Sequence, residues 1–228
     1  GAIWRTIRFA KEEVERELNG VSDNPLIFTV EDNTQGNTVG EWIEAGNFHG
    51  ASIGLAMDHL ATALTQLATL SERRIFKLTH GKLSNNLPSF LVQGTGLNSG
   101  FMLAQYTAAA LASECKGFAH PASADSIPTV QHHEDHVSMS PIAARKALKI
   151  LECLADIIAI ELLVGAQALD LRHKVDQYKA PSDLAALHEV IRQDVPFWED
   201  DEVLHPAIRS LSILVRQGIP LPQPSQFS

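Results

Sequence analysis

Apolar residues recur along the first segment of the chain at the spacing of a helix. Between residues 3 and 19 they are separated by steps of three or four, which places them on one face of an α-helix. These positions are Ile3, Ile7, Ala10, Val14 and Leu18. Asn19 and Gly20 then provide a helix stop. The pattern therefore predicts an amphipathic helix over residues 3–19.

A second helical pattern covers residues 47–79 and has the spacing of a seam in a helix bundle. Its apolar positions are Ile53, Met57, Leu60, Leu64 and Leu67. Residues 22–25, Ser-Asp-Asn-Pro, predict a turn, because Pro25 disfavours the helical conformation for the residue before it. The polar residues 29–46 are interpreted as a loop or a short hairpin.

Four further helices are predicted after a break at residues 80–90. They cover about 98–118, 141–173, 182–195 and 201–217, with a second break at 120–130. Residues 220–228 form a tail punctuated by prolines.

The helix predicted over 141–173 contains no proline after Pro141 and a single glycine, Gly165. Within it, residues 157–169 carry one charged side chain, Glu161, and are otherwise apolar nearly all round. Such a helix is buried on every side, in a large bundle or at a subunit interface. We therefore predict an all-α fold, a bundle of long antiparallel helices.

Charge and hydropathy narrow the class of function. The net charge is −9, and no basic run is longer than Arg73-Arg74. Because nucleic-acid-binding proteins usually show a basic patch, we expect no nucleic-acid partner. The longest apolar stretch, 154–169, is interrupted by Asp156 and Glu161, which indicates a core helix and no membrane association.

The two cysteines, Cys115 and Cys153, lie in helical patterns and are expected to be buried free thiols in a reducing compartment. The first residues lack the order of a signal peptide, and the expected location is cytoplasmic. The chain has no initiating Met and starts in helical phase. We therefore expect it to be a piece of a longer protein.

Residues 131–140, Gln-His-His-Glu-Asp-His-Val-Ser-Met-Ser, concentrate the candidate chemistry. His132 and His136 have the spacing of two zinc ligands on a helix, but the string does not match HEXXH and no third ligand is evident. The alternative is structural: Ser138 or Ser140 caps the next helix, and the neighbouring acids favour its dipole. That interpretation does not explain three imidazoles in one short segment.

Three other segments allow a functional and a structural interpretation. Gly-Asn-Phe-His-Gly at 46–50 precedes a helix and can be only a cap. In Gly-Leu-Asn-Ser-Gly-Phe-Met at 96–102, backbone N–H groups at a helix start could hold an anion such as a substrate carboxylate. Leu-Ser-Glu-Arg-Arg at 70–74 is expected to form surface or interhelical ion pairs. From the residues alone, caps and ion pairs are the favoured interpretation.

Taken in order, nine segments resemble one family. They are SDNPLIF, GNFHG, LSERR, LPSFLV, GLNSGFM, HPASADSIPT, EDHVSM, AIELL and QALD. This set is similar to the aromatic amino-acid ammonia-lyases and aminomutases, and EDHVSM and HPASADSIPT most resemble the histidine ammonia-lyases. The resemblance runs from the first residue to about Arg172.

The resemblance implies the core of a homotetrameric lyase that removes ammonia from an aromatic L-amino acid, with histidine to urocanate favoured. The electrophile in this family is a methylidene-imidazolone (MIO), made from an Ala-Ser-Gly triplet. This sequence contains no Ala-Ser-Gly. We therefore expect the N-terminal half of the same enzyme to supply the MIO, the chain alone to be inactive, and no metal to take part.

The resemblance also implies roles for five residues. Phe48 matches an aromatic residue that stacks beside the MIO, and Glu134 matches a carboxylate near the substrate amine or ring. Met102 and Tyr106 match positions that line the side-chain pocket. His133 stands where the family often has Asn or Gln, and this departure leaves the substrate open.

Two further interpretations stay open. A tyrosine or phenylalanine ammonia-lyase, or an aminomutase, fits the same segments, and so does a non-catalytic lyase-like scaffold without MIO. By the resemblance, residues 1–174 are the central helical bundle of the lyase, and residues 175–228 are a C-terminal helical packing segment and tail of the same domain.

Overall fold

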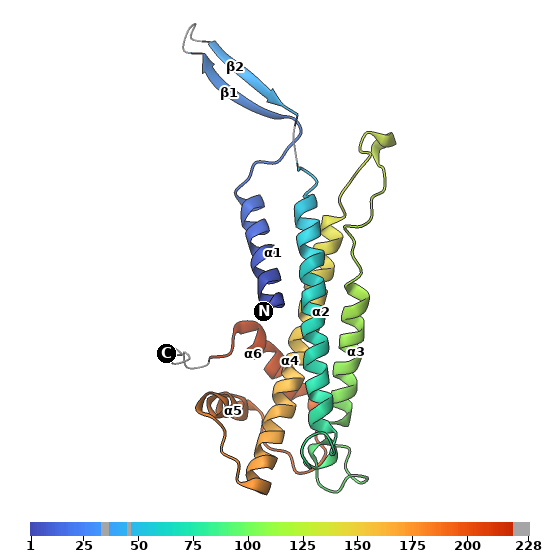
Figure 1. Cartoon of the computed structure of the whole chain (residues 1–228), viewed down its shortest axis with the longest axis vertical. Coiled ribbons are helices and arrows are strands. Elements are labelled where there is room, and N and C mark those ends of the chain that lie inside the picture. Colours follow the sequence, from blue (N-terminus) through green and yellow to red (C-terminus); the bar gives the residue numbers. More distant parts are fainter. Residues whose placement is uncertain (33–36, 45–46, 221–228) are drawn as a thin grey trace. The chain divides into compact units, whose positions relative to one another are not determined.

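The computed structural model describes residues 1–32, 37–44 and 47–220, and these residues are mainly helical (Figure 1). The α-helices are α1 (Ala2–Leu18), α2 (Ala51–Thr79), α3 (Met102–Phe118), α4 (Ser140–Asp176), α5 (Ser182–Asp194) and α6 (Leu204–Gln217). The strands are β1 (Leu26–Asp32) and β2 (Asn37–Ile43), and two short 3₁₀ turns are η1 (Ser89–Leu91) and η2 (Val130–His132). The predicted all-α class is confirmed, with one two-stranded sheet added.

The chain divides into two compact units, which are described separately. Unit 1 comprises residues 1–63 and 118–149, and unit 2 comprises residues 64–117 and 150–228. Helices α2 and α4 therefore contribute to both units. The predicted division at residue 174 rests on resemblance alone and stays a prediction.

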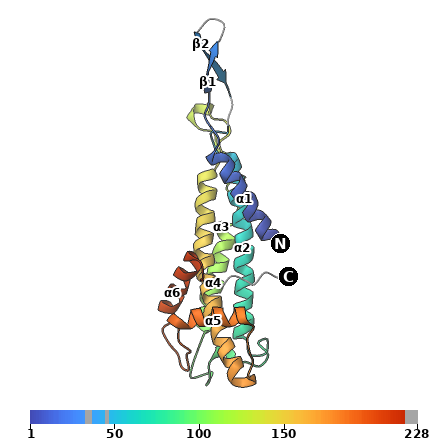
Figure 2. The same ribbon diagram turned by 90° about the vertical axis from the view of Figure 1, so that its left-hand side faces the viewer.

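In unit 1, α1 lies beside the first half of α2 (Figures 1 and 2). The rings of Phe9 and His59 approach to 5.7 Å between centroids, and Thr6 Oγ1 lies 3.3 Å from His59 Nε2. Thr6 and Ala10 are the buried positions of α1. The amphipathic helix predicted over 3–19 is therefore confirmed.

The segment after α1 folds as a hairpin that begins earlier than predicted. Strands β1 and β2 pair antiparallel, with Leu26 opposite Ile43 and Ile27 opposite Trp42. Those apolar cross-strand pairs extend the ladder beyond the polar residues that suggested a loop or hairpin at 29–46. Part of that predicted segment, 33–36 and 45–46, lies outside the described residues.

The buried face of α2 differs from the predicted seam. The fully buried apolar positions include small residues, among them Ala56, Ala61 and Ala68, each 0% exposed. Of the predicted seam, Leu64 is buried and the others are half-buried. Alanine buries little surface but allows backbones to approach closely, a feature that a search for large apolar residues overlooks.

In unit 2, α4 provides the centre of the packing. From residue 157 to residue 169 every side chain is buried or half-buried, so the predicted all-round burial is confirmed. Gln167 is buried there, and its amide nitrogen donates to the carbonyl oxygens of Leu91 (3.2 Å) and Trp198 (2.7 Å). The Trp198 ring stacks on Phe101, with centroids 5.3 Å apart. A polar side chain thus ties two irregular segments to the central helix.

Two short helices pack on α4 within unit 2. Helix α5 lies beside its C-terminal half, where Arg192 Nε donates to Asp170 at 2.9 Å (Figure 2). Helix α6 is joined to α4 by Ser212, which donates to Asp156. None of the helices within the described residues is both long and apolar enough to cross a membrane.

The third helix begins later than predicted, at Met102 instead of about residue 98. Gly100 has a φ of +53°, and a Cβ placed there would come within 2.5 Å of the Phe90 carbonyl oxygen. Residues 94–100 therefore form turns in which this glycine is needed for both conformation and space.

Candidate functional site

The start of α2 is a junction of three helices in unit 1. The hydroxyls of Ser138 and Ser140, at the start of α4, both donate to the carbonyl oxygen of His49. From α1, the carboxylate of Glu17 accepts hydrogen bonds from Asn47 and from Ser52, the latter at 2.6 Å. The segment that carries Phe48 is therefore held from both sides.

Two glycines allow α2 and α4 to approach at this junction. Gly50 has a φ of +62°, and a Cβ there would lie 3.4 Å from Ser140 Oγ. A Cβ at Gly54 would lie 3.3 Å from both Cα and Cβ of Ser140. The serines proposed as helix caps thus serve as a link between α4 and residue 49. The carbonyl of Met139, just before α4, accepts the first helical N–H groups, those of Ile142 and Ala143.

Phe48 remains open to solvent in this arrangement. Its ring is 45% exposed and packs at a tilt against the ring of His49, with centroids 4.1 Å apart. Gly46, the first residue of the predicted motif, lies outside the described residues. Part of the ring is therefore open to solvent, and its role in stacking stays a prediction.

Glu134 closes a tight turn before α4. Thr129 and Glu134 form an isolated antiparallel bridge, in which Thr129 N donates to Glu134 O at 2.9 Å. The Thr129 hydroxyl also donates to Glu134 Oε2 at 2.7 Å. Within residues 131–136, Glu134 is the one side chain that is half-buried instead of exposed. The carboxylate is therefore held at one oxygen.

The segment leading to Glu134 is fixed at two further points. The Ser126 hydroxyl accepts from Val137 N at 3.1 Å. Asp58 on α2 accepts a hydrogen bond from Ser123 N at its Oδ2 atom, at 2.7 Å. Its other oxygen, Oδ1, is buried and has no hydrogen-bond partner among the described residues. Together with the bonds of Ser138 to residue 49, these contacts bring the Phe48 and Glu134 segments into one unit.

The zinc hypothesis finds no support in this geometry. His132, His133 and His136 are all exposed. No cluster of three or more His, Cys, Asp or Glu side chains suited to a metal ion occurs in the part of the chain that the structure describes. A third ligand for His132 and His136 is therefore missing from those residues.

Met102 and Tyr106 belong to unit 2, which is described by itself. Met102 is the first residue of α3, and Tyr106 follows one helical turn later. Met102 is half-buried, whereas Tyr106 is 63% exposed. The two side chains therefore share one face of α3, as the helical spacing predicts.

The backbone N–H groups before α3, which were considered as an anion site, already have an anionic partner. The carboxylate of Asp201 accepts from Ser99 N (2.9 Å to Oδ2) and from Gly100 N (2.6 Å to Oδ1). Asp200 accepts from the side chain of Asn98 at 2.9 Å. The hypothesis of a substrate carboxylate at these groups is therefore corrected: a carboxylate does bind there, but it belongs to the chain itself.

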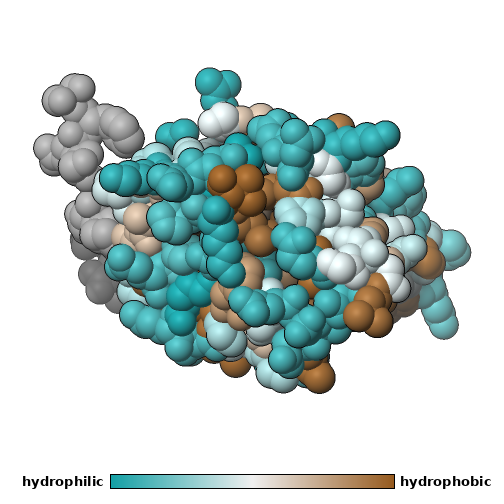
Figure 3. Space-filling model, turned by 90° about the horizontal axis from the view of Figure 1, so that it is seen from below, coloured by the Kyte–Doolittle hydropathy of each residue, from teal (hydrophilic) through white to brown (hydrophobic). Residues whose placement is uncertain are grey.

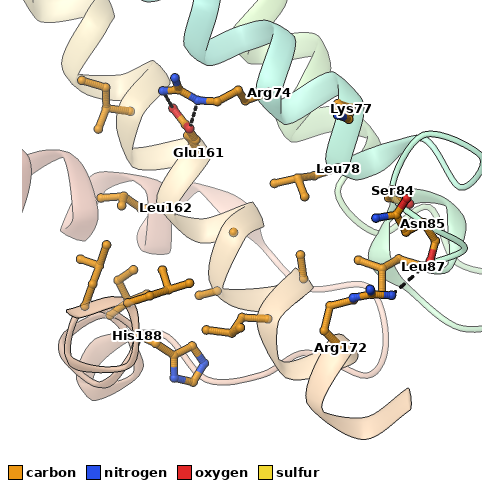
Figure 4. A pocket seen from close by; sticks show the side chains of 18 of the residues that line it. Arg74, Lys77, Leu78, Ser84, Asn85, Leu87, Glu161, Leu162, Arg172 and His188 are labelled. Carbon is orange, nitrogen blue, oxygen red and sulfur yellow. Dashed lines mark hydrogen bonds and ion pairs between the residues drawn. The ribbon is translucent and has the colours of Figure 1, made fainter. Parts of the chain in front are cut away.

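A cavity of about 780 Å³ lies in unit 2 between α2, α4 and α5 (Figure 4). Leucines, isoleucines and alanines line most of it. At its edge Arg74 pairs with Glu161, and Arg172 donates to the carbonyl of Asn85. The Glu161 hydrogen bond raises the pKa of Arg74. The Arg74–Glu161 contact confirms the interhelical ion pair predicted for residues 70–74.

On the surface seen from below, hydrophobic residues lie between hydrophilic ones (Figure 3).

Sequence reasoning missed three residues that shape these sites: Asp58, Thr129 and Asp201. Asp58 had a detectable signal, since it interrupts the apolar face of a helix in the string Gly-Leu-Ala-Met-Asp. Thr129 and Asp201 had none, because their partners depend on how the loops fold.

The long central helix and the mainly helical fold agree with the class that the sequence resembles, the helical ammonia-lyases. The aromatic amino acid lyase family model matches residues 1–193. The chain belongs to this family, and its histidine ammonia-lyase relatives are carbon–nitrogen lyases.

Relatives and solved structures place the similarity more closely. The chain is 45% identical to a histidine ammonia-lyase of Chloroflexus aurantiacus over 221 residues, 96% of this chain and 41% of the relative. The crystal structure of histidine ammonia-lyase from Trypanosoma cruzi matches with a TM-score of 0.85 and 42% identity, over 96% of this chain and 41% of that one. Tyrosine aminomutase from Streptomyces globisporus matches with a TM-score of 0.84 and 37% identity, over 95% and 39%. The chain thus spans about two fifths of the length of the relatives it matches.

Proposed function

We propose that this chain is part of an ammonia-lyase that converts an aromatic L-amino acid, with histidine favoured, into the trans-unsaturated acid and ammonia. The observation that carries the proposal is the 45% identity to a histidine ammonia-lyase across 96% of this chain. A small-molecule amino acid is then the substrate.

In the elimination, the bond between the α-carbon and nitrogen breaks and a base removes the β-proton. The electron pair of the β C–H bond becomes the C=C bond, and nitrogen leaves as ammonia. A carboxylate is suited to hold a cationic amine or a hydrogen-bonding imidazole while this happens. Glu134 supports that role because it is half-buried and bonded at Oε2 by Thr129.

The MIO is proposed to come from residues outside this chain, because no Ala-Ser-Gly triplet is present. When bound, it supplies an electrophile that withdraws electrons and makes ammonia a better leaving group. Phe48 fits beside such a planar group, since its ring is 45% exposed and held at a fixed junction. Its part in the site is to orient and to exclude water.

Met102, Tyr106 and His133 are proposed to contact the substrate side chain. Tyr106 and Met102 share a face of α3 and offer a phenol and a thioether. His133 is exposed and departs from the Asn or Gln that the family often has there. This departure leaves open whether the substrate is histidine or tyrosine.

The remainder of the enzyme and further copies of the chain are proposed partners. Large apolar side chains are exposed on three helices, including Leu55 on α2, Leu103 on α3 and Leu151 on α4, each more than half exposed. Their exposure supports burial against other chains. The proposed assembly is a homotetramer, which sedimentation of the assembled enzyme tests. A cytoplasmic location stays a prediction.

Glu134→Gln tests the proposal in the assembled lyase. The amide keeps the shape of the side chain but removes its charge, so turnover of the true substrate should fall by about 100-fold or more. The neighbouring Asp135→Asn is the matched control, because Asp135 is exposed and should leave the rate within about 2-fold. Unchanged kinetics of Glu134→Gln with histidine, tyrosine and phenylalanine would remove Glu134 from the mechanism.

Two alternative functions have observations of their own. The match to a tyrosine aminomutase structure favours an aminomutase, which would return a β-amino acid instead of releasing the unsaturated acid. The missing triplet favours a non-catalytic scaffold. Analysis of the product distinguishes an aminomutase from a lyase. If no product forms even when the remaining part of the enzyme is present, the scaffold is favoured.

A further inference from the structure

Thr129 contacts Glu134 twice. Its backbone N–H donates to the carbonyl oxygen of Glu134 at 2.9 Å, and its hydroxyl donates to Oε2 of the same residue at 2.7 Å. Because a carboxylate accepts hydrogen bonds, the Thr129 hydroxyl is the donor, and the bond holds the position of Oε2. A free glutamate side chain samples several rotamers, and this bond restricts them.

The turn between the two residues adopts an unfavourable backbone conformation. Val130, Gln131 and His132 have φ values of +49°, +54° and +69°. Left-handed conformation is unfavourable for any residue with a side chain and most of all for a β-branched one such as Val130. His133 N donates to Val130 O at 3.0 Å and closes the turn. Surrounding bonds must therefore hold the turn, and the Thr129–Glu134 bridge spans it.

We propose that Thr129 is a positioning residue that orients the carboxylate of Glu134 for the substrate. This inference rests on the proposed role of Glu134 and adds a residue to it. The hydroxyl holds Oε2 and leaves Oε1 available for the substrate amine or ring. Placing the carboxylate before substrate binds avoids the cost of ordering it during the reaction.

The test uses the assembled lyase and two substitutions at residue 129. Thr129→Val keeps the shape of the side chain and the backbone bridge but removes the hydroxyl. Thr129→Ser keeps the hydroxyl and removes the methyl group. We expect Thr129→Val to lower kcat on the order of 10-fold, with a smaller change in KM. Thr129→Ser should stay within about 2-fold of the original enzyme. The thermal midpoint of each variant checks that the fold is kept.

A double-mutant cycle with Glu134→Ala separates positioning from a general structural effect, because alanine has no oxygen to accept the Thr129 hydroxyl. If Thr129 acts through Glu134, Thr129→Val has no further effect once Glu134 is replaced. Where turnover of Glu134→Ala is too low to measure, the dissociation constant of urocanate replaces kcat in the same cycle. Equal losses in both backgrounds, or full activity of Thr129→Val, would overturn the proposal.

The outcome also distinguishes this inference from the proposed function. If Glu134→Gln lowers turnover while Thr129→Val does not, only the role of Thr129 is wrong. If Glu134→Gln has no effect with any of the three amino acids, the role of Glu134 fails and the inference about Thr129 fails with it.

Discussion

Asp58 shows how a single buried charge can organise the candidate site. A buried carboxylate is costly unless hydrogen bonds compensate for its lost hydration. Asp58 is 5% exposed and accepts one bond, from the backbone of Ser123. That bond attaches the segment leading to Thr129 and Glu134 to α2, the same helix whose start follows Phe48. One residue therefore contributes to the placement of both candidate residues.

The pH dependence of stability should report on Cys115. This thiol is fully buried on α3, and burial raises its pKa to about 12, with Cys153 and Glu114 acting in the same direction. An unfolded thiol ionises near pH 9, so between about pH 9 and 12 the folded state holds a proton that the unfolded state has lost. The free energy of unfolding should therefore fall as pH rises through this window, by at most about 1.4 kcal/mol per pH unit.

Urea unfolding followed by circular dichroism at several pH values above 8 measures that slope. Lysine and tyrosine also titrate there, so the comparison is with Cys115→Ala, in which the thiol contribution is gone and the slope should be shallower. Cys153 is half-buried, and Cys153→Ala should change the slope less. Identical slopes for all three proteins would contradict the account of Cys115.

At the level of the helix, two glycines make a matched pair. Gly165 lies inside α4, and a Cβ added there meets nothing within 4 Å. Because alanine favours helix over glycine, Gly165→Ala should raise the free energy of unfolding by about 1 kcal/mol. At Gly54 in α2 the added Cβ would lie 3.3 Å from Cα and Cβ of Ser140, so the gain in propensity is opposed by crowding.

Thermal unfolding of the two variants measures the difference. Gly165→Ala should have the higher midpoint, and Gly54→Ala should fall below the original protein because α4 must shift from the junction at residue 49. Equal midpoints would show that the close approach of Gly54 and Ser140 is not a constraint.

Elements that depend on a local sequence pattern could be predicted, and those that depend on tertiary contacts could not. The pattern predicted α4 over 141–173, close to the observed Ser140–Asp176, because a run without proline and with few polar residues is a local signal. The start of α3 was wrong because Gly100 adopts a positive φ against Phe90, a contact that the sequence does not reveal. The face of α2 was predicted only in part, because small residues such as Ala56 and Ala61 are fully buried, whereas of the five predicted seam residues only Leu64 is buried.

The candidate site was predicted by resemblance more than by pattern. Phe48 and Glu134 were identified through family motifs, and their segments meet through Ser138 and the carbonyl of His49. Thr129 could not be identified, because its role depends on a left-handed turn formed by residues without glycine. Their functional roles stay predictions.

For the molecule as a whole, the candidate site is proposed to need residues outside this chain. It matches 41% of the length of a histidine ammonia-lyase and contains no Ala-Ser-Gly triplet. We therefore propose that this chain supplies the carboxylate and the aromatic wall of the site, and that the remainder of the enzyme supplies the electrophile. Large exposed apolar side chains such as Leu55 and Leu103 agree with that division.

The most direct measurement is the rate of urocanate formation from L-histidine by this chain alone and by this chain together with the remaining part of a related lyase. We predict no turnover by the chain alone, turnover by the combination, and loss of that turnover when Glu134 is replaced by Gln. Turnover of histidine by the chain alone at the rate of the combination would contradict this prediction.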